Sequence, residues 1–115
     1  MPVSIVPVIV KQVPDKMTVT WNLIDDSVGL PVEIGSLSDK CIQFTGVFAA
    51  AVVTLEGSND GVTYVTLTDQ NDNNISTTVN KIEMVAQNPR YIRPAASAAG
   101  DGTTAVQAVL FAKRP

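Results

Sequence analysis

Residues 51–68, AVVTLEGSNDGVTYVTLT, constrain the fold most, because they predict two β-strands joined by a tight loop. Apolar and polar residues alternate along both arms, so that Val65 and Leu67 should share one face of the second arm. A period of two is typical of a half-buried strand. Between the arms, residues 58–61 read Ser-Asn-Asp-Gly, which provide the side chains and backbone freedom that hairpin turns require. We therefore predict a β-hairpin at this position.

The composition favours a single all-β domain. The chain has 115 residues, the size of one domain, and 45% of them are apolar although only 5% are aromatic. Val and Thr are abundant, and β-branched side chains favour strands. Turn-forming residues recur at short intervals, and no stretch shows the pattern of an amphipathic helix. We predict an antiparallel β-sandwich of about eight strands with jelly-roll or related topology.

Charge and reactive residue types exclude several functions. The net charge is −3 at pH 7, so the chain does not provide the basic surface that a phosphate backbone requires, and we expect no nucleic-acid partner. The sequence contains no His and one Cys. This composition removes Ser-His-Asp and Cys-His catalysis, ordinary zinc sites and internal disulfides. We expect neither an enzyme nor a bound cofactor.

The distribution of apolar residues predicts no membrane association. No apolar run approaches the roughly 18 residues of a membrane span. Residues 1–10 are apolar, but they lack the basic leader and the small-residue cleavage site of a signal peptide. We expect a protein that is made and folded in a cytoplasm.

The first sixteen residues, MPVSIVPVIVKQVPDK, are an apolar stretch interrupted by Pro2, Pro7 and Pro14. Because proline lacks the N–H that a central strand donates, we predict an edge strand or extended arm over 1–16 and the sandwich domain over 17–115. Two alternatives stay open: the segment covers its own core, or it docks on a neighbouring subunit by strand addition. In the second case the apolar interface residues would be Val3, Ile5, Val6, Val8, Ile9 and Val10.

Alternation predicts strands along the rest of the chain. Trp21, the single Trp, is expected to anchor the core, and Pro94 is expected to confine its strand to a sheet edge. Residues 69–78, DQNDNNISTT, are the most polar stretch and predict a long exposed loop. Residues 104–113 are almost continuously apolar and predict a central strand buried on both faces. The remaining strands are expected at 17–24, 30–34, 41–46, 82–86 and 90–96.

One spacing among the turn residues permits a metal site. Asp69, Asn71 and Asn73 fall at the first three ligand positions of a calcium loop of the EF-hand kind. The rest of that pattern is missing, because Asn74 replaces the expected Gly and Asn80 stands where the bidentate Glu should be. The first three residues are therefore a calcium candidate that matches only part of the motif.

Several side chains belong to the types enriched at protein interfaces. Tyr64, Tyr91, Arg90 and Arg93 are of this kind. A Tyr on a sandwich strand is also commonly a core or rim residue, so both interpretations stay open for the tyrosines. We include Arg90 and Arg93 among the expected interface residues.

Several short motifs carry a resemblance to a known group of proteins. They are SDK at 38–40, FTG at 44–46, VTLEGSNDGVTYVTL at 53–67, Asp69, YIRP at 91–94 and GDGTT at 100–104. Together they lie within 38–113, about two-thirds of the chain. This region resembles small structural proteins of tailed phages and, among these, the capsid decoration or cement proteins.

The resemblance implies a structural virion protein that binds the outer surface of a phage capsid and clamps neighbouring capsid subunits. Its partners would be the major capsid protein and further copies of itself, with a trimer favoured over a dimer because shell proteins often meet at three-fold points. Such a protein would be made in the host cytoplasm and carried on the virion. One alternative is a tail, baseplate or head-fibre module with the same sandwich. A carbohydrate-binding module ranks lower, since one Trp and two Tyr offer few aromatic rings.

Overall fold

The computed structural model describes residues 3–13, 15–34, 37–97 and 103–114, with the backbone alone for 8–13. The regular structure in these ranges consists of β-strands. None of these residues forms a helix, and hence no helix long and apolar enough to cross a membrane is found among them. The strands are β1 Val3–Ile5, β2 Val8–Val13, β3 Lys16–Leu23, β4 Ser27–Gly29, β5 Val32–Glu33, β6 Asp39–Val47, β7 Val53–Ser58, β8 Val65–Thr66, β9 Ser76–Thr77, β10 Lys81–Met84, β11 Tyr91–Ala96 and β12 Ala105–Lys113.

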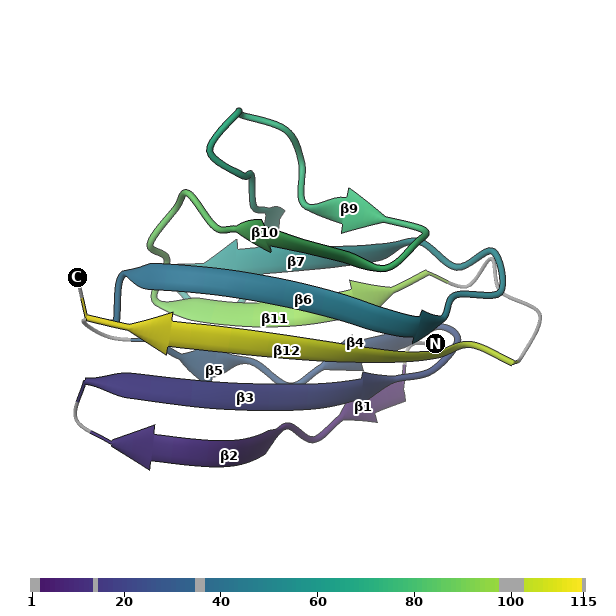
Figure 1. Ribbon diagram of the computed structural model, residues 1–115, viewed down its shortest axis with the longest axis horizontal. Coiled ribbons are helices and arrows are strands. Elements are labelled where there is room, and N and C mark those ends of the chain that lie inside the picture. The colour runs from purple at the N-terminus through teal and green to yellow at the C-terminus, as the bar shows by residue number, and fades with distance from the viewer. Residues whose placement is uncertain (1–2, 14, 35–36, 98–102, 115) are drawn as a thin grey trace.

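The strands form two sheets that pack face to face as a β-sandwich (Figure 1). The front sheet in Figure 1 has five strands in the order β10-β6-β12-β3-β2, and all its pairs are antiparallel. The seven-stranded sheet runs β1-β4-β11-β7-β8, with β5 also beside β11 and β9 beside β7. Its β1–β4 pair is parallel. The expected all-β, largely antiparallel sandwich is confirmed. The described ranges hold more strands than the eight expected, because several pairings involve only two or three residues.

Side chains from the facing sides of both sheets fill the interior. On β3 every second residue from Met17 to Leu23 is buried, as the alternation predicts. Trp21 is fully buried, and its Nε1 donates a 2.9 Å hydrogen bond to the carbonyl oxygen of Leu30. This bond satisfies the polar atom of the indole and fixes the ring in the core, as expected. Other large, fully buried side chains are Phe44, Leu23, Ile42, Leu55, Ile75, Ile92 and Leu110.

Strand β12 lies at the centre of the five-stranded sheet, as predicted for residues 104–113. It pairs antiparallel with β3 on one side and β6 on the other. The expectation that both its faces are buried is wrong, because burial alternates along the strand. Val106, Ala108, Leu110 and Ala112 face the core, whereas Phe111 lies on the outer face and is exposed. The apolar run therefore reflects one buried face and one apolar face that remains in contact with solvent.

Pro94 lies in an internal strand, so the prediction of an edge strand is wrong. β11 pairs with β7 on one side and with β4 and β5 on the other. Leu55, opposite Pro94 on β7, donates its N–H to Ile75 and thus faces away from β11. The Pro94 nitrogen, which carries no hydrogen, therefore faces the gap between β4 and β5. No backbone hydrogen bond of the sheet is lost there. Gly29 makes room there, since a Cβ would lie 2.6 Å from both Pro94 Cδ and Trp21 Cδ1.

The β7–β8 hairpin confirms the strongest sequence prediction, with one correction. The two strands pair antiparallel, but the second arm ends at Thr66. Val65 and Leu67 differ in burial, although they stand two residues apart and lie beside Gly57 and Leu55 of β7 in turn. Leu67 is buried and donates its N–H to Leu55 O at 2.9 Å, whereas Val65 is 66% exposed.

The polar stretch 69–78 is only partly an exposed loop, which corrects the prediction. Residues 70–74 are exposed, but Ser76–Thr77 form β9 and pair with β7. Ile75 is fully buried, and its N–H donates to Leu67 O at 2.8 Å. A single apolar residue among nine polar ones gives no periodic signal, so its burial was missed.

The N-terminal segment contributes one strand to each sheet (Figure 1). β1 lies at the edge of the seven-stranded sheet beside β4, and β2 lies at the edge of the five-stranded sheet beside β3. Pro7 falls between them, where the chain passes from one sheet to the other. Whether this segment also contacts a neighbouring subunit, and the division of the chain at residue 16, stay predictions.

Candidate interaction surfaces

The hairpin loop between β7 and β8 is ordered by one carboxylate. Asp60 Oδ1 accepts hydrogen bonds of 2.8 Å from the N–H groups of Val62 and Thr63, and another of 2.8 Å from Ser58 Oγ. Ser58 Oγ in turn accepts from Gly61 N at 2.9 Å, and Gly61 has a φ of +75°. The bonds from Thr63, Val62 and Ser58 favour the ionised form and lower the Asp60 pKa to about 2. This network explains why Ser-Asn-Asp-Gly makes a defined turn.

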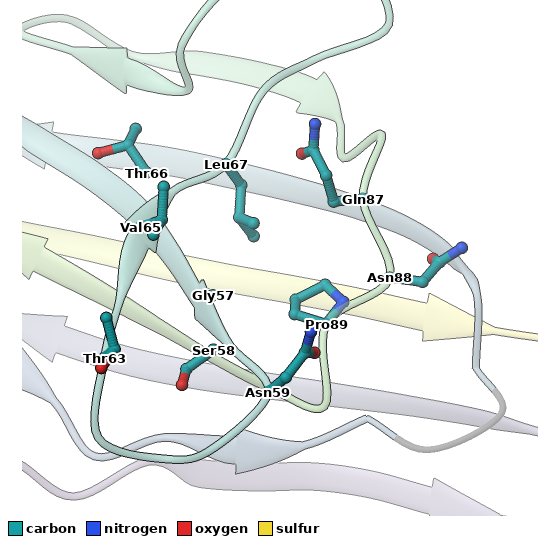
Figure 2. A pocket seen from close by; sticks show the side chains of 10 residues that line it. All are labelled: Gly57, Ser58, Asn59, Thr63, Val65, Thr66, Leu67, Gln87, Asn88 and Pro89. Atoms are coloured by element: carbon teal, nitrogen blue, oxygen red, sulfur yellow. The ribbon is translucent and has the colours of Figure 1, made fainter.

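Beside this loop lies a groove with a volume of about 410 Å³ (Figure 2). Gly57 forms part of its wall, and a Cβ there would lie 2.6 Å from Pro89 Cγ. The amide oxygens of Asn59 and Gln87 accept hydrogen bonds from the backbone N–H groups of Arg90 and Thr68. The groove thus joins the hairpin to the segment before β11 through internal hydrogen bonds. It is lined by Gly57, Ser58, Asn59, Thr63, Val65, Thr66, Leu67, Gln87, Asn88 and Pro89.

The groove offers polar groups, most of them amides and hydroxyls. The residues that line it include no acid, Lys, Arg or Cys, and Asn88 Oδ1 accepts a hydrogen bond from Lys40 Nζ. The groove can therefore support hydrogen bonding to a partner surface.

Arg93, one of the expected interface residues, is held by two contacts on the seven-stranded sheet. Its Nε donates to Glu56 Oε1 at 2.9 Å, and its guanidinium carbon lies 3.7 Å from the centroid of the Tyr64 ring. The side chains of Arg93 and Glu56 are only partly exposed, by 27% and 23%. Arg93 therefore has a structural role in this sheet, whether or not it also meets a partner.

Arg90, the other expected interface residue, is more exposed. Its Nε lies 3.4 Å from Glu33 Oε2, and its guanidinium carbon lies 5.2 Å from the centroid of the Tyr91 ring. Both members of the ion pair are more than half exposed. Exposed pairs of this kind contribute little to stability, so Arg90 remains available for contact with another molecule.

The N-terminal interface residues are partly accessible. Val3 is 49% exposed and Val6 is 71% exposed, whereas Ile5 packs against the core. The side chains of Val8, Ile9 and Val10 lie outside the described part of the structure. The proposed docking role of all six residues stays a prediction.

The outer face of the five-stranded sheet carries a further apolar surface that the sequence prediction did not single out. Register places Met84, Cys41 and Phe111 side by side on β10, β6 and β12. Ile82 lies on the same face and is 62% exposed, with Met84 44% and Phe111 38% exposed. Burial raises the pKa of the Cys41 thiol, so the thiol stays protonated at neutral pH. In the sequence, this surface is indicated by apolar Ile82 and Met84, which alternate with charged residues.

A shallow depression of about 250 Å³ lies within this outer apolar face. It is lined by Asp39, Lys40, Cys41, Met84, Phe111 and Lys113. Exposed apolar residues rimmed by charges are a common feature of protein-binding surfaces. The face therefore joins the N-terminal segment as a candidate contact surface.

The calcium candidate forms a turn closed by its own hydrogen bonds. Asp69 Oδ1 accepts from Asn71 N at 2.8 Å and from Asn73 N at 3.1 Å. These bonds, the one from Asn73 first, lower the pKa of Asp69. The described residues contain no group of three or more His, Cys, Asp or Glu side chains that could hold a metal ion. Asp69, Asn71 and Asn73 stay a calcium candidate that matches only part of the motif.

Comparison with known proteins identifies the fold. No protein-family model matches the sequence, and no curated protein matches it. The structure is similar to that of the SPBc2 prophage-derived protein YomS, with a TM-score of 0.65, 15% identity, and coverage of 90% of this chain and 96% of YomS. It is also similar to a cupin superfamily protein from Desulfitobacterium hafniense DCB-2, with a TM-score of 0.54, 10% identity, and coverage of 100% of this chain and 82% of that protein. Together these likenesses show a jelly-roll-like β-sandwich fold.

Proposed function

We propose that this protein is a structural component of a phage virion, and specifically a decoration protein that binds the outer surface of the capsid and clamps neighbouring capsid subunits. The observation that carries the proposal is the fold similarity to a prophage-derived protein, which spans nearly the whole length of both chains. The motifs shared with tailed-phage structural proteins point the same way. The absence of His from the sequence agrees with a non-catalytic role.

Exposed residues of the N-terminal segment and of β11 suggest how such a protein would bind. Val3 and Val6 project from the N-terminal segment, and Arg90 is exposed at the start of β11. A decoration protein that contacts two capsid subunits raises the free energy needed to separate them, because the bound state is favoured by mass action. Interfaces on the order of several hundred Å² per partner are enough for stable association. The major capsid protein is the proposed partner, and the virion the proposed location.

The direct test is binding to heads purified from a mutant of the parent phage in which the gene for this protein has been deleted. We expect the purified protein to sediment with these heads in a saturable manner and to raise the temperature at which the shells dissociate. Tails purified from the same phage serve as the comparison. Binding to tails and not to heads would overturn the capsid assignment and favour the tail, baseplate or head-fibre alternative. Binding to neither would contradict a virion role.

Two matched variants locate the contact. Val6→Lys places a charge on the N-terminal segment, and Val62→Lys places one in the hairpin loop, where the side chain is also exposed. Both should leave the melting temperature unchanged, because surface substitutions away from packed groups have small effects on stability. We expect Val6→Lys alone to weaken head binding by about tenfold, which corresponds to about 1.4 kcal/mol. Equal binding by both variants and the wild type would exclude the N-terminal segment from the interface.

A further inference from the structure

Strand β10 is an edge strand with an apolar, exposed outer face. It pairs with β6 on one side and is the last strand of the five-stranded sheet (Figure 1). Unprotected edges with apolar residues are templates for pairing with another strand. Here Ile82 and Met84 are exposed on the outer face. Ala86 N donates to Thr68 O at 2.9 Å, so the edge is covered from Ala86 onward and the open part comprises residues 80–84.

The hydrogen-bonding direction along β10 follows from one backbone hydrogen bond. Val85 N donates to Lys40 O at 3.1 Å, which makes Val85 a residue whose backbone groups face β6. In an antiparallel ladder these directions alternate. The backbone groups of Lys81 and Glu83 therefore face β6, and those of Ile82 and Met84 face away from it. Ala86 agrees with this alternation, because its N–H donates to Thr68 and not to β6.

We propose that β10 pairs antiparallel with β10 of a second copy of this chain, with Ile82 opposite Ile82 of that copy at a two-fold axis. An axis through Ile82 brings Lys81 opposite Glu83 of the second copy, and Glu83 opposite Lys81. Shifting the axis to Glu83 places the two Glu83 residues opposite each other, and shifting it to Lys81 places the two lysines opposite each other. Opposite charges across a strand pair stabilise it and like charges destabilise it. The charge pattern thus selects one self-complementary register.

Glu83 has surroundings that a second ammonium group would suit. Its side chain is only 10% exposed, and Lys81 of the same chain, itself 45% exposed, lies 3.8 Å from its Oε2. Burial and a side-chain hydrogen bond with Asp69 raise the pKa of Glu83. A further positive charge beside this carboxyl group would favour its ionised form. In the proposed register, Lys81 of the second copy supplies that charge.

The pairing would also join two apolar surfaces. Ile82 of each copy would meet on the outer face, where Met84 and Phe111 already lie. The two five-stranded sheets would become one continuous ten-stranded sheet across the two-fold axis. An isologous contact of this kind gives dimers or assemblies built from dimers, rather than the trimer favoured by the family resemblance. The inference rests on the strand geometry and not on the proposed function.

Charge reversal tests the register directly. The wild type should show about twice the mass of one chain by light scattering at micromolar concentrations. Lys81→Glu places Glu opposite Glu, and Glu83→Lys places Lys opposite Lys, so each variant alone should dimerise about tenfold more weakly or worse. Mixed together, the two variants again bring opposite charges face to face at both positions. We expect the mixture to form a heterodimer that neither variant forms with itself.

The mixing step separates the proposal from a loss of folding. Each variant also loses the Lys81–Glu83 contact within its own chain, and mixing does not restore that contact. Near-ultraviolet circular dichroism of each variant should match the wild type, and Ile82→Lys gives a second, independent way to block the pairing. A monomeric wild type, or a mixture that stays monomeric, would overturn the proposal and make Lys81 a residue that protects the edge. A trimer with a mass unaffected by any variant would overturn it as well.

Discussion

Arg93 stacks on Tyr64 with its guanidinium carbon 3.7 Å from the ring centroid, while its Nε donates to Glu56 Oε1 at 2.9 Å. The three side chains come from β11, the chain before β8, and β7, so they tie neighbouring strands together. Both members of the ion pair are only partly exposed, which reduces solvent screening. We expect Arg93→Ala to lower the free energy of unfolding by about 1–2 kcal/mol, measured by urea denaturation.

Arg90→Ala is the matched control for that prediction. The Arg90–Glu33 pair is longer, at 3.4 Å, and exposed on both sides, so its loss should change stability by less than about 0.5 kcal/mol. If both variants lost the same unfolding free energy, the lower exposure of the Arg93 contacts would make no difference to stability.

The Tyr64 hydroxyl should be dispensable for stability. Tyr64 Oη is buried and has no hydrogen-bond partner among the described residues. Removing an unsatisfied polar atom is neutral or favourable, so Tyr64→Phe should keep the unfolding free energy or raise it by up to about 1 kcal/mol. A loss of stability in thermal and urea melts would mean that the hydroxyl has a partner in solution.

A side chain at Gly29 should destabilise the fold. A Cβ at this position would lie 2.6 Å from Pro94 Cδ and from Trp21 Cδ1, and both rings are held by packing. Overpacking of this kind costs about 1–3 kcal/mol, so Gly29→Ala should lower the melting temperature by several degrees. The adjacent Leu30→Ala, at an exposed position, should have a much smaller effect. A Gly29→Ala protein as stable as the wild type would show that the two rings can move apart.

Asp60 should remain ionised to unusually low pH. Its folded-state pKa is about 2, below its ordinary value of 3.8, because the N–H groups of Thr63 and Val62 and the Ser58 hydroxyl bond the carboxylate. A depressed acid pKa adds stability that is present above the unfolded pKa and is lost as pH falls through the folded one. Carbon NMR of the Asp60 carboxyl should therefore show no titration between about pH 3 and 5. A midpoint near 4 would mean that the loop bonds do not persist in solution.

The Asp69 turn should not depend on calcium. Asp69 Oδ1 already accepts two backbone N–H groups, which close the turn without an ion. We expect identical melting curves in excess calcium and in chelator. A rise of several degrees with calcium would instead establish the site suggested by Asp69, Asn71 and Asn73.

The sequence predicted strands well where alternation was complete and failed where long-range partners decided the outcome. Met17 to Leu23 alternate over a full strand, and their burial follows that pattern. Pro94 is different, because its tolerance inside a sheet depends on a gap between β4 and β5 that no local pattern reveals. The Ser27–Gly29 strand was missed for the same reason, since its partners are β1 and β11.

Contact surfaces were harder to predict than the fold. An exposed apolar residue is visible only when the faces of a strand are known, and a four-residue strand such as β10 gives a weak periodic signal. Arg93 looked like an interface residue by type, yet its partners Glu56 and Tyr64 lie in the same chain. The sequence does not encode such pairings locally, because they arise from sheet register.

The central position of β12 has a consequence for how the protein is made. β3 and β6 flank this strand, yet both are synthesised well before it. Until Lys113 has left the ribosome, the two earlier strands present unpaired edges towards the place that β12 will occupy. Such long-range pairing is slow and leaves strands open to wrong partners in the meantime. Expression at lower temperature, or together with a chaperone, should therefore raise the yield of native protein.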